Sequence, residues 1–192
     1  MKKHLKIMNL PSQINECTRC PLCSNVDHKV LPTIFPPYYV KGVHKLPRIV
    51  APSLILYVTN FPSMEGYITK EPITGELLAE LKDINDEVGN PSYTITPSVH
   101  CAPFTDEYRS STSDPSPSEI KACRVNLDSI VEATDPQLIV ALGKVAARAI
   151  KHITNRKTIM INHPYTIISS KHYELEHKRA VLKLKSALQA LS

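Results

Sequence analysis

Five cysteines are the residues of this 192-residue chain whose type and spacing allow metal chemistry. Cys17, Cys20 and Cys23 stand three residues apart, while Cys101 and Cys123 lie far along the chain. A soft metal centre, either zinc or an iron–sulfur cluster, needs about four thiolates, and one C-x-x-C pair with two distant cysteines supplies them. The spacing does not separate zinc from iron–sulfur, and it also permits thiols that are simply buried. In either metal arrangement Cys23 is left over.

The composition indicates a single globular domain, residues 1–192, in a reducing compartment. The chain is 42% hydrophobic and 21% charged, as is ordinary for globular proteins. No apolar run approaches the roughly 18 residues of a membrane span, and the first residues show no secretory signal. We therefore expect a cytoplasmic protein with no membrane partner, in which disulfides are disfavoured. The formal net charge of +5 is compatible with a nucleic-acid partner but is weak evidence for one.

Apolar runs and helical periodicities alternate along the chain after residue 52. We expect strands at residues 53–60, 92–99, 136–143 and 157–164. We expect helices at residues 75–89, 116–134, 144–153 and 173–191. Ser116 and Glu119 have the spacing of a capping box at the start of the second helix. The alternation predicts an α/β protein, a three-layer α/β/α sandwich around a central, mostly parallel sheet.

Two stretches lack this periodicity. Residues 1–52 are rich in proline, which predicts an irregular, extended segment. Its part from about residue 14 to residue 52 contains the C-x-x-C pair, so we expect this part to bind the metal centre. Residues 104–118 are rich in Ser, Thr, Asp and Pro and predict a long polar loop.

The residues that follow the predicted strands are the candidates for a ligand site, because parallel α/β sheets bind ligands outside the carboxyl ends of their strands. These candidates are residues 59–65, residues 96–101, Gly143 and His163.

Several short motifs together resemble the uracil-DNA glycosylase superfamily, most closely its iron–sulfur branch, family 4. The motifs are "CTRCPL" at 17–22, "VHCAP" at 99–103, "SEIKAC" at 118–123, "PQLIVALGKVAA" at 136–147 and the pair His163–Pro164. The resemblance covers about residues 14–190. It implies a DNA-binding, DNA-repair enzyme that flips a base out of the duplex and hydrolyses its N-glycosidic bond. It also implies a [4Fe–4S] cluster with four ligands, which are Cys17, Cys20, Cys101 and Cys123; zinc is the alternative.

The sequence departs from the family pattern where the pattern reads and holds the base. The family's G-E-x-P-G turn is here Thr59–Ser63, with Asn60 at the acidic position. The substrate-binding positions that the resemblance implies are Phe61, Pro62, Ser63, Ile73, Pro97 and Tyr165. Ile73 replaces the ring that stacks on the flipped base, Pro97 replaces the asparagine that reads uracil, and Tyr165 replaces a serine. We therefore expect altered or lost uracil activity.

Three residues are candidates for the catalytic roles that the resemblance implies. His163 can donate a hydrogen bond to the leaving base, and Asn60 can position the attacking water. Glu65 is the nearest carboxylate in sequence and can take the role of the missing acid. The alternatives are a structural histidine at a strand end, an Asx turn and a solvated surface charge.

The basic last helix and the segment before it are the candidates for phosphate contacts, through Lys171, Lys178 and Arg179. A solvated outer face is the alternative.

Two classes of function remain: a diverged glycosylase acting on a damaged or modified base, or a catalytically silent protein that binds DNA or a protein partner. A zinc-stabilised structural protein is a third, more distant interpretation. We expect a monomer associated with the nucleoid.

Overall fold

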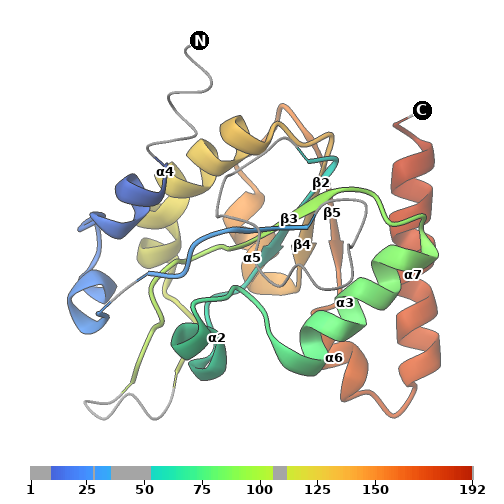
Figure 1. Cartoon of the computed structure of the whole chain (residues 1–192), viewed down its shortest axis with the longest axis horizontal. Helices are drawn as coiled ribbons and strands as arrows, with labels where there is room; N and C mark the ends of the chain where they lie inside the picture. Colours follow the sequence, from blue (N-terminus) through green and yellow to red (C-terminus); the bar gives the residue numbers. More distant parts are fainter. Residues whose placement is uncertain (1–9, 28, 36–52, 106–111, 192) are drawn as a thin grey trace.

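The computed structural model describes residues 10–27, 29–35, 53–105 and 112–191; for residues 25, 34–35 and 64–66 it describes the backbone alone. Its sheet has the strand order β1-β3-β2-β4-β5 (Figure 1). The strands are β1 (Thr33–Phe35), β2 (Ile55–Thr59), β3 (Tyr93–Pro97), β4 (Leu138–Leu142) and β5 (Lys157–Ile161). β2, β3, β4 and β5 run parallel, and β1 pairs antiparallel with β3 at one edge. The predicted α/β fold with a mostly parallel sheet is therefore confirmed.

The three central strands are buried at every position. β4 is an uninterrupted apolar run and β2 is one up to Thr59, as expected for strands buried on both faces, whereas β3 alternates and also buries Thr94 and Thr96. Successive side chains alternate between two separate cores. Leu56 and Val58 of β2 belong to one core, whereas Ile55 and Tyr57 belong to the other. β5 is an edge strand with alternating burial, and its Met160 is partly exposed.

Helices cover both faces of the sheet and complete the three layers (Figure 1). One face carries α4 (Pro117–Thr134), α5 (Lys144–Ile150) and a helical turn at residues 10–15. The other face carries α3 (Gly75–Glu87), α6 (Pro164–Ile168) and α7 (Tyr173–Gln189). The short helix α2 (Met64–Thr69) follows β2.

The predicted capping box of α4 is present. The Ser116 hydroxyl accepts a hydrogen bond from the Glu119 amide at 3.3 Å, and Glu119 Oε2 accepts one from the Ser116 amide at 2.7 Å. These bonds satisfy two donors that a helix start would leave unpaired. The cap fixes where α4 begins and so fixes the position of Cys123, two turns into the helix.

Several short helices and one short strand were not predicted from the sequence. They are the turn at residues 10–15, the 3-10 helix η1 (Pro21–Asn25), β1, α2 and α6. Each is at most six residues long, so tertiary packing rather than periodicity determines it. The interpretation of residues 1–52 as irregular was therefore wrong for residues 10–15, 21–25 and 33–35; residues 1–9 and 36–52 lie outside the described residues. The predicted loop at 104–118 includes a bridge between Phe104 and Thr112, and its residues 106–111 also lie outside them.

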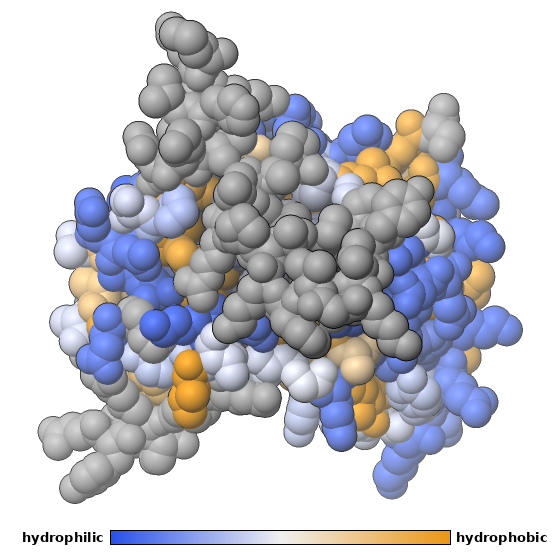
Figure 2. Space-filling view, viewed as in Figure 1, coloured by the Kyte–Doolittle hydropathy of each residue, from blue (hydrophilic) through white to orange (hydrophobic). Residues whose placement is uncertain are grey.

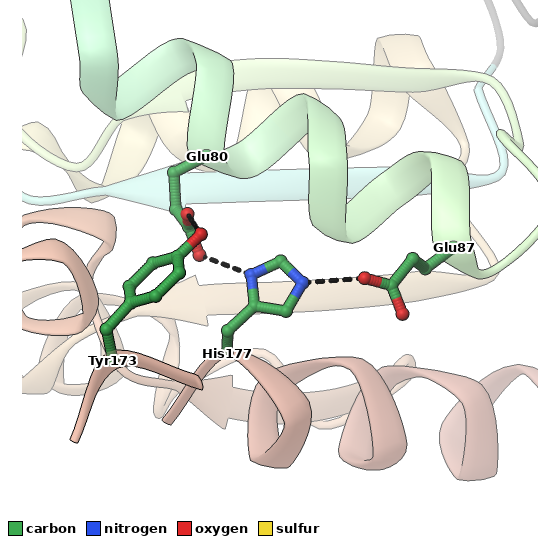
Figure 3. A network of polar contacts seen from close by, with 4 residues as sticks. All are labelled: Glu80, Glu87, Tyr173 and His177. Carbon is green, nitrogen blue, oxygen red and sulfur yellow. Dashed lines mark hydrogen bonds and ion pairs between the residues drawn. The ribbon is translucent and has the colours of Figure 1, made fainter. Parts of the chain in front are cut away.

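A polar network joins α3 to α7 on the outer layer (Figure 3). His177 of α7 lies between two carboxylates of α3, with Nδ1 2.7 Å from Glu80 Oε1 and Nε2 2.7 Å from Glu87 Oε1. The Tyr173 hydroxyl donates to the other oxygen of the buried Glu80 at 2.8 Å. Burial lowers the pKa of His177, but its bonds to Glu87 and Glu80 outweigh burial and hold that pKa above its usual value. When His177 is protonated, both ring nitrogens donate and the ring bridges both carboxylates.

In the described part of the chain, no helix combines the length and apolar character that crossing a membrane requires.

Candidate functional site

Three strands deliver polar residues to one place at the carboxyl edge of the sheet. Asn60 follows β2, Gly143 follows β4, and His163 lies two residues after β5. Gly143 has φ +88°, and a Cβ on it would lie 3.4 Å from His163 Cβ and 3.6 Å from Asn60 Oδ1. A side chain at this position would therefore be strained by the backbone, whereas its Cβ would meet both neighbours only at ordinary van der Waals distance. Gly143 thus adjoins both the asparagine and the histidine.

His163 is held as a neutral ring with a defined proton. It is the N-cap of α6, and its Nδ1 accepts a hydrogen bond from the Tyr165 amide at 3.2 Å. Because Nδ1 accepts, the proton of the neutral ring is on Nε2, which donates to Thr59 Oγ1 at 3.0 Å. Burial lowers the pKa of His163 to about 4, so the ring is uncharged at neutral pH. The site thus contains a neutral donor fixed by two contacts.

Asn60 brings a buried acceptor to the same place. Its Oδ1 is buried and has no hydrogen-bond partner among the described residues. Ser98 fixes the backbone at this point, because its amide donates to Thr59 O at 2.9 Å and to Asn60 O at 3.1 Å, and its hydroxyl donates to Asn60 O. A buried acceptor without a donor costs about 1–3 kcal/mol. A water or a ligand that donates to Oδ1 would recover this energy.

The predicted substrate-binding residues differ in how they are placed. Phe61 packs partly buried against the core under α4 and α5, and Pro62 is buried, while Ser63 is exposed. Tyr165 is 66% exposed, close to His163 in sequence and bonded to it through its amide. The turn after β2 and the start of α6 therefore frame the Asn60–His163 site.

Ile73 and Pro97 are placed inside the protein. Ile73 is 5% exposed and belongs to the core under α3 and α7. Pro97 is the last residue of β3, is buried and pairs with Thr59 of β2. The side chain of Glu65 lies outside the described residues, although its backbone belongs to α2.

The five cysteines converge at a second place, next to α4. They line one partly open cavity, together with Arg19, Lys29, His100, Ala122 and Asn126. Cys101 and Cys123 are buried, and the three N-terminal cysteines are partly buried. The structure thus brings together the four cysteines that the resemblance selected, and it adds Cys23 to them.

The electrostatics of this cavity disfavour uncompensated thiolates. Burial raises the pKa of Cys101 to about 12 and that of Cys123 to about 11, and the repulsion from neighbouring thiolates acts in the same direction. Burial also raises the pKa of Cys20. A positively charged group bound between the sulfur atoms would reverse this effect.

The donor set of the cavity fits a metal centre bound by thiolates, either an iron–sulfur cluster or zinc. Cysteine thiolates are the usual ligands of such clusters, and each thiolate of a four-iron cluster binds a different iron, so the ligands surround a volume. A single zinc ion instead requires sulfur atoms about 2.3 Å from one point. All five cysteines line one cavity, so its lining supplies the thiolates that either metal centre would need.

The predicted phosphate-binding residues are all exposed. Lys171 precedes α7, and Lys178 and Arg179 lie on its outer face. Arg179 pairs with Glu176 at 2.6 Å, and Glu176 also accepts a hydrogen bond from Asn162 at 2.8 Å. The described residues on the α7 side are mostly hydrophilic in Figure 2, with small separate apolar spots. Because Asn162 precedes His163, this chain of contacts connects α7 to the strand-end site.

The structure adds four residues to these two places; Thr59 and Ser98 fall within the predicted ranges 59–65 and 96–101 but had no role of their own, and Arg19 and Asn126 were missed. Thr59 is the partner of His163 Nε2, and Ser98 anchors the turn after β2. Arg19 and Asn126 line the cysteine cavity. The only sequence signals were the position of Thr59 at a strand end and that of Arg19 between two cysteines.

An α/β sandwich with polar residues gathered at the carboxyl ends of its parallel strands defines a class of ligand-binding and catalytic domains. A family model described as the uracil DNA glycosylase superfamily matches residues 55–190. The match spans more than half of the chain, so the chain belongs to the uracil DNA glycosylase superfamily. No curated protein matches the chain.

Proposed function

We propose that the protein is a DNA glycosylase that hydrolyses the N-glycosidic bond of a damaged or modified base flipped out of DNA. The observation that carries the proposal is the meeting of Asn60, Gly143 and His163 at the carboxyl ends of β2, β4 and β5. Membership of the superfamily supports the same reaction class. The geometry adds a neutral donor and an unpartnered acceptor in one place.

The neutral donor suits the leaving base. Breaking the base–sugar bond places negative charge on the base, and a preorganised donor stabilises that charge. His163 Nε2–H is such a donor, and its present acceptor is Thr59 Oγ1 at 3.0 Å. A bound base competes with Thr59 for this proton. The bond from the Tyr165 amide to Nδ1 keeps the proton on Nε2 throughout.

The unpartnered acceptor suits the attacking water. Asn60 Oδ1 can accept a hydrogen bond from a water and so orient its oxygen toward the sugar. An amide does not take a proton at neutral pH, so Asn60 acts by positioning and not as a base. Glu65, five residues further along the chain, is the carboxylate proposed to assist.

The proposed enzyme prefers a base other than uracil. A site that hydrogen-bonds its substrate discriminates through those bonds. Pro97 offers no side-chain donor or acceptor and is buried in β3, and Ile73 is buried in the core. The two positions that the resemblance associates with reading and stacking the base therefore lack the groups for either task.

The cysteine cavity is proposed to hold a [4Fe–4S] cluster through Cys17, Cys20, Cys101 and Cys123, with zinc as the alternative and Cys23 as a neighbour. When bound, such a group supplies a cross-link between chain segments. Here the ligands would join the N-terminal knuckle, the loop after β3 and α4. Exposed Lys171, Lys178 and Arg179 are proposed to contact DNA phosphates.

Abasic-site formation on a panel of oligonucleotides tests the proposed activity. The panel contains uracil, hypoxanthine, xanthine and modified pyrimidines, each in single-stranded and duplex form. We expect product on at least one modified base other than uracil. No product on any substrate would contradict the enzymatic proposal.

A silent DNA-binding protein is the second candidate, and one observation favours it. The Nε2–H of His163 is already donated to Thr59, which leaves the donor satisfied in the absence of a base. Salt-sensitive DNA binding without product on the whole panel would favour this candidate. Absence of DNA binding at low salt would favour a protein partner.

A further inference from the structure

Two polar residues connect the N-terminal cysteines to α4 across the cysteine cavity. Arg19 Nη1 lies 3.3 Å from Cys17 Sγ and 2.9 Å from Asn126 Oδ1. Asn126 Nδ2 in turn faces Cys123 Sγ at 4.0 Å. A continuous path of donors and acceptors therefore runs Cys17–Arg19–Asn126–Cys123, between two cysteines that are 106 positions apart in the sequence (123 − 17).

The sequence explains why this path forms. Asn126 is three residues after Cys123, and residues at this spacing share one face of a helix. Arg19 stands between Cys17 and Cys20, so its side chain starts at the rim of the cavity. A guanidinium nitrogen carries two hydrogens, which allows Nη1 to serve a sulfur and an amide oxygen together.

The chemistry of the partners fixes the orientation of Asn126. Arginine is a donor only, so the amide oxygen must face Arg19. The amide nitrogen then necessarily faces Cys123. Asn126 is 1% exposed, and a buried amide at this position is stabilised only if both of its ends are used. Both ends are directed at the cysteine cavity.

We propose that Arg19 and Asn126 are positioning residues for a metal centre bound by the cysteines, and that they donate hydrogen bonds to the sulfur atoms of Cys17 and Cys123. This inference rests on the [4Fe–4S] cluster of the proposed function. Donors to the ligand sulfurs stabilise the more negative, reduced form of a cluster and so raise its reduction potential. They also hold the thiolates in place against loss of iron.

The positive charge of Arg19 strengthens this role. Hydrogen bonds from a charged donor are stronger than neutral ones, and thiolates in a buried cavity need compensation. Arg19 is the only cation with a described hydrogen bond to a cysteine sulfur in the parts of the chain that the structure describes. Lys29 also lines the cavity, but its Nζ donates to the backbone carbonyl of Asn15 at 2.6 Å.

Reductive titration and chelator challenge of the purified protein test the inference. Dithionite supplies the electron and the cluster accepts it, and the midpoint is followed by the loss of absorbance near 400 nm. In Arg19→Met we expect a lower midpoint, so that the ratio of reduced to oxidised cluster at a fixed potential falls about tenfold. We expect iron loss to a chelator to become about 10- to 100-fold faster.

Three further variants separate hydrogen bonding from general effects. Arg19→Lys keeps the charge but not the planar group, so it should restore part of the midpoint shift. Asn126→Asp removes the donor to Cys123 and should lower the midpoint. Arg124→Met is the matched control, because Arg124 neighbours Cys123 in sequence but has no described hydrogen bond to a cysteine. Its midpoint should change clearly less than that of Arg19→Met.

The outcomes distinguish this inference from the proposed cluster. A wild-type protein without iron and acid-labile sulfide would overturn both. A wild-type protein that contains the cluster, with unchanged midpoint and iron loss in Arg19→Met and Asn126→Asp, would overturn only the inference. Equal shifts in Arg19→Met and Arg124→Met would also overturn it. If Arg19→Met fails to fold by circular dichroism, Arg19→Lys and Asn126→Asp decide the question.

Discussion

The cysteine cavity and the strand-end site are built on the same scaffold but differ in how closely they follow the family pattern. At the cavity, all four cysteines of the pattern are present, and the structure brings them together. At the strand ends, His163 and Pro164 follow the pattern, whereas Ile73, Pro97 and Tyr165 depart from it. The proposed metal site thus keeps its full set of cysteines, and the proposed base-binding site is altered.

The two regions therefore separate structure from specificity under the proposed function. Loss of one of the proposed cysteine ligands would remove a link between the N-terminal knuckle and α4. The departures at Ile73 and Pro97 place well-packed, buried side chains there, and under the same proposal they alter only the recognition of a base. Variants at the two regions should therefore fail in different measurements, and the following predictions use that contrast.

The largest effect is expected from removal of a buried cysteine. Cys123→Ser should lose the bound iron and sulfide, because α4 then contributes no thiolate to the cavity. Since metal binding contributes directly to folding free energy, the variant should also melt at lower temperature. Iron analysis and thermal unfolding measure both effects. Cys23→Ser is the control and should retain the iron. Loss of iron from Cys23→Ser to the same extent as from Cys123→Ser would show that Cys23 is a ligand and not a neighbour.

The next largest effect is expected from His163→Ala. Loss of a positioned hydrogen-bond donor to the leaving base should reduce base release about 100-fold or more. The iron content should stay at the wild-type level, because His163 lies at the other site. His152→Ala is a matched control, since His152 bonds Asp128 and the Ala149 carbonyl instead. Full activity in His163→Ala would remove the role that we assign to this residue.

The pH profile of the same reaction sharpens the assignment of His163. Its pKa of about 4 keeps the ring neutral across the usual assay range. The rate of base release by wild type should therefore not change through a titration of His163 near pH 6.5. Any inflection seen there should also be present in His163→Ala. An inflection that is absent from His163→Ala would mean that the ring is protonated in the active form.

A smaller effect is expected from the basic residues near α7. Replacing Lys171 and Lys178 by Gln should weaken DNA binding. The negative slope of the logarithm of the binding constant against log salt should become shallower, by up to about 0.9 for each phosphate that the variant no longer binds. Fluorescence anisotropy at several salt concentrations gives this slope. An unchanged slope would show that these lysines are a solvated face.

The smallest effect is expected from the α3–α7 network. The pKa of His177 is higher in the folded protein than in the unfolded chain, where it is about 6.5. The contribution of His177 to the free energy of unfolding is therefore fully present below pH 6.5. It is lost as the pH rises through the pKa of the folded protein. Between the unfolded and the folded pKa of His177, wild type should therefore lose some free energy of unfolding as the pH rises. His177→Gln should show no such loss. Denaturant unfolding at several pH values measures this. A loss that persists in His177→Gln would assign it to another group.

The sequence predicted the parts of the fold that depend on periodicity and caps. The buried strands 55–59 and 138–142 appear as uninterrupted apolar runs, and Ser116 with Glu119 marks the start of α4. The three-residue strand β1 and the five-residue helix α6 were missed, because segments of this length are stabilised by their neighbours and carry no period of their own.

The candidate sites were predictable to a different extent. Residues 59–65 and His163 were found because strand ends of parallel sheets bind ligands, and the cysteines because of their spacing. The resemblance then selected Asn60 within that range and four of the five cysteines. The hydrogen-bond partners of these residues were not predicted. Thr59 and Asn126 acquire their roles only when distant segments pack together, and neither carries a sequence signal of that contact.

The decisive experiment measures base release and iron content together, on wild type and on His163→Ala. We expect wild type to carry a full cluster and to release a modified base, and His163→Ala to carry the same cluster and to release at most about 1% as much. Release that is unaffected in His163→Ala, or a wild type that releases no base from any substrate of the panel, would contradict this expectation.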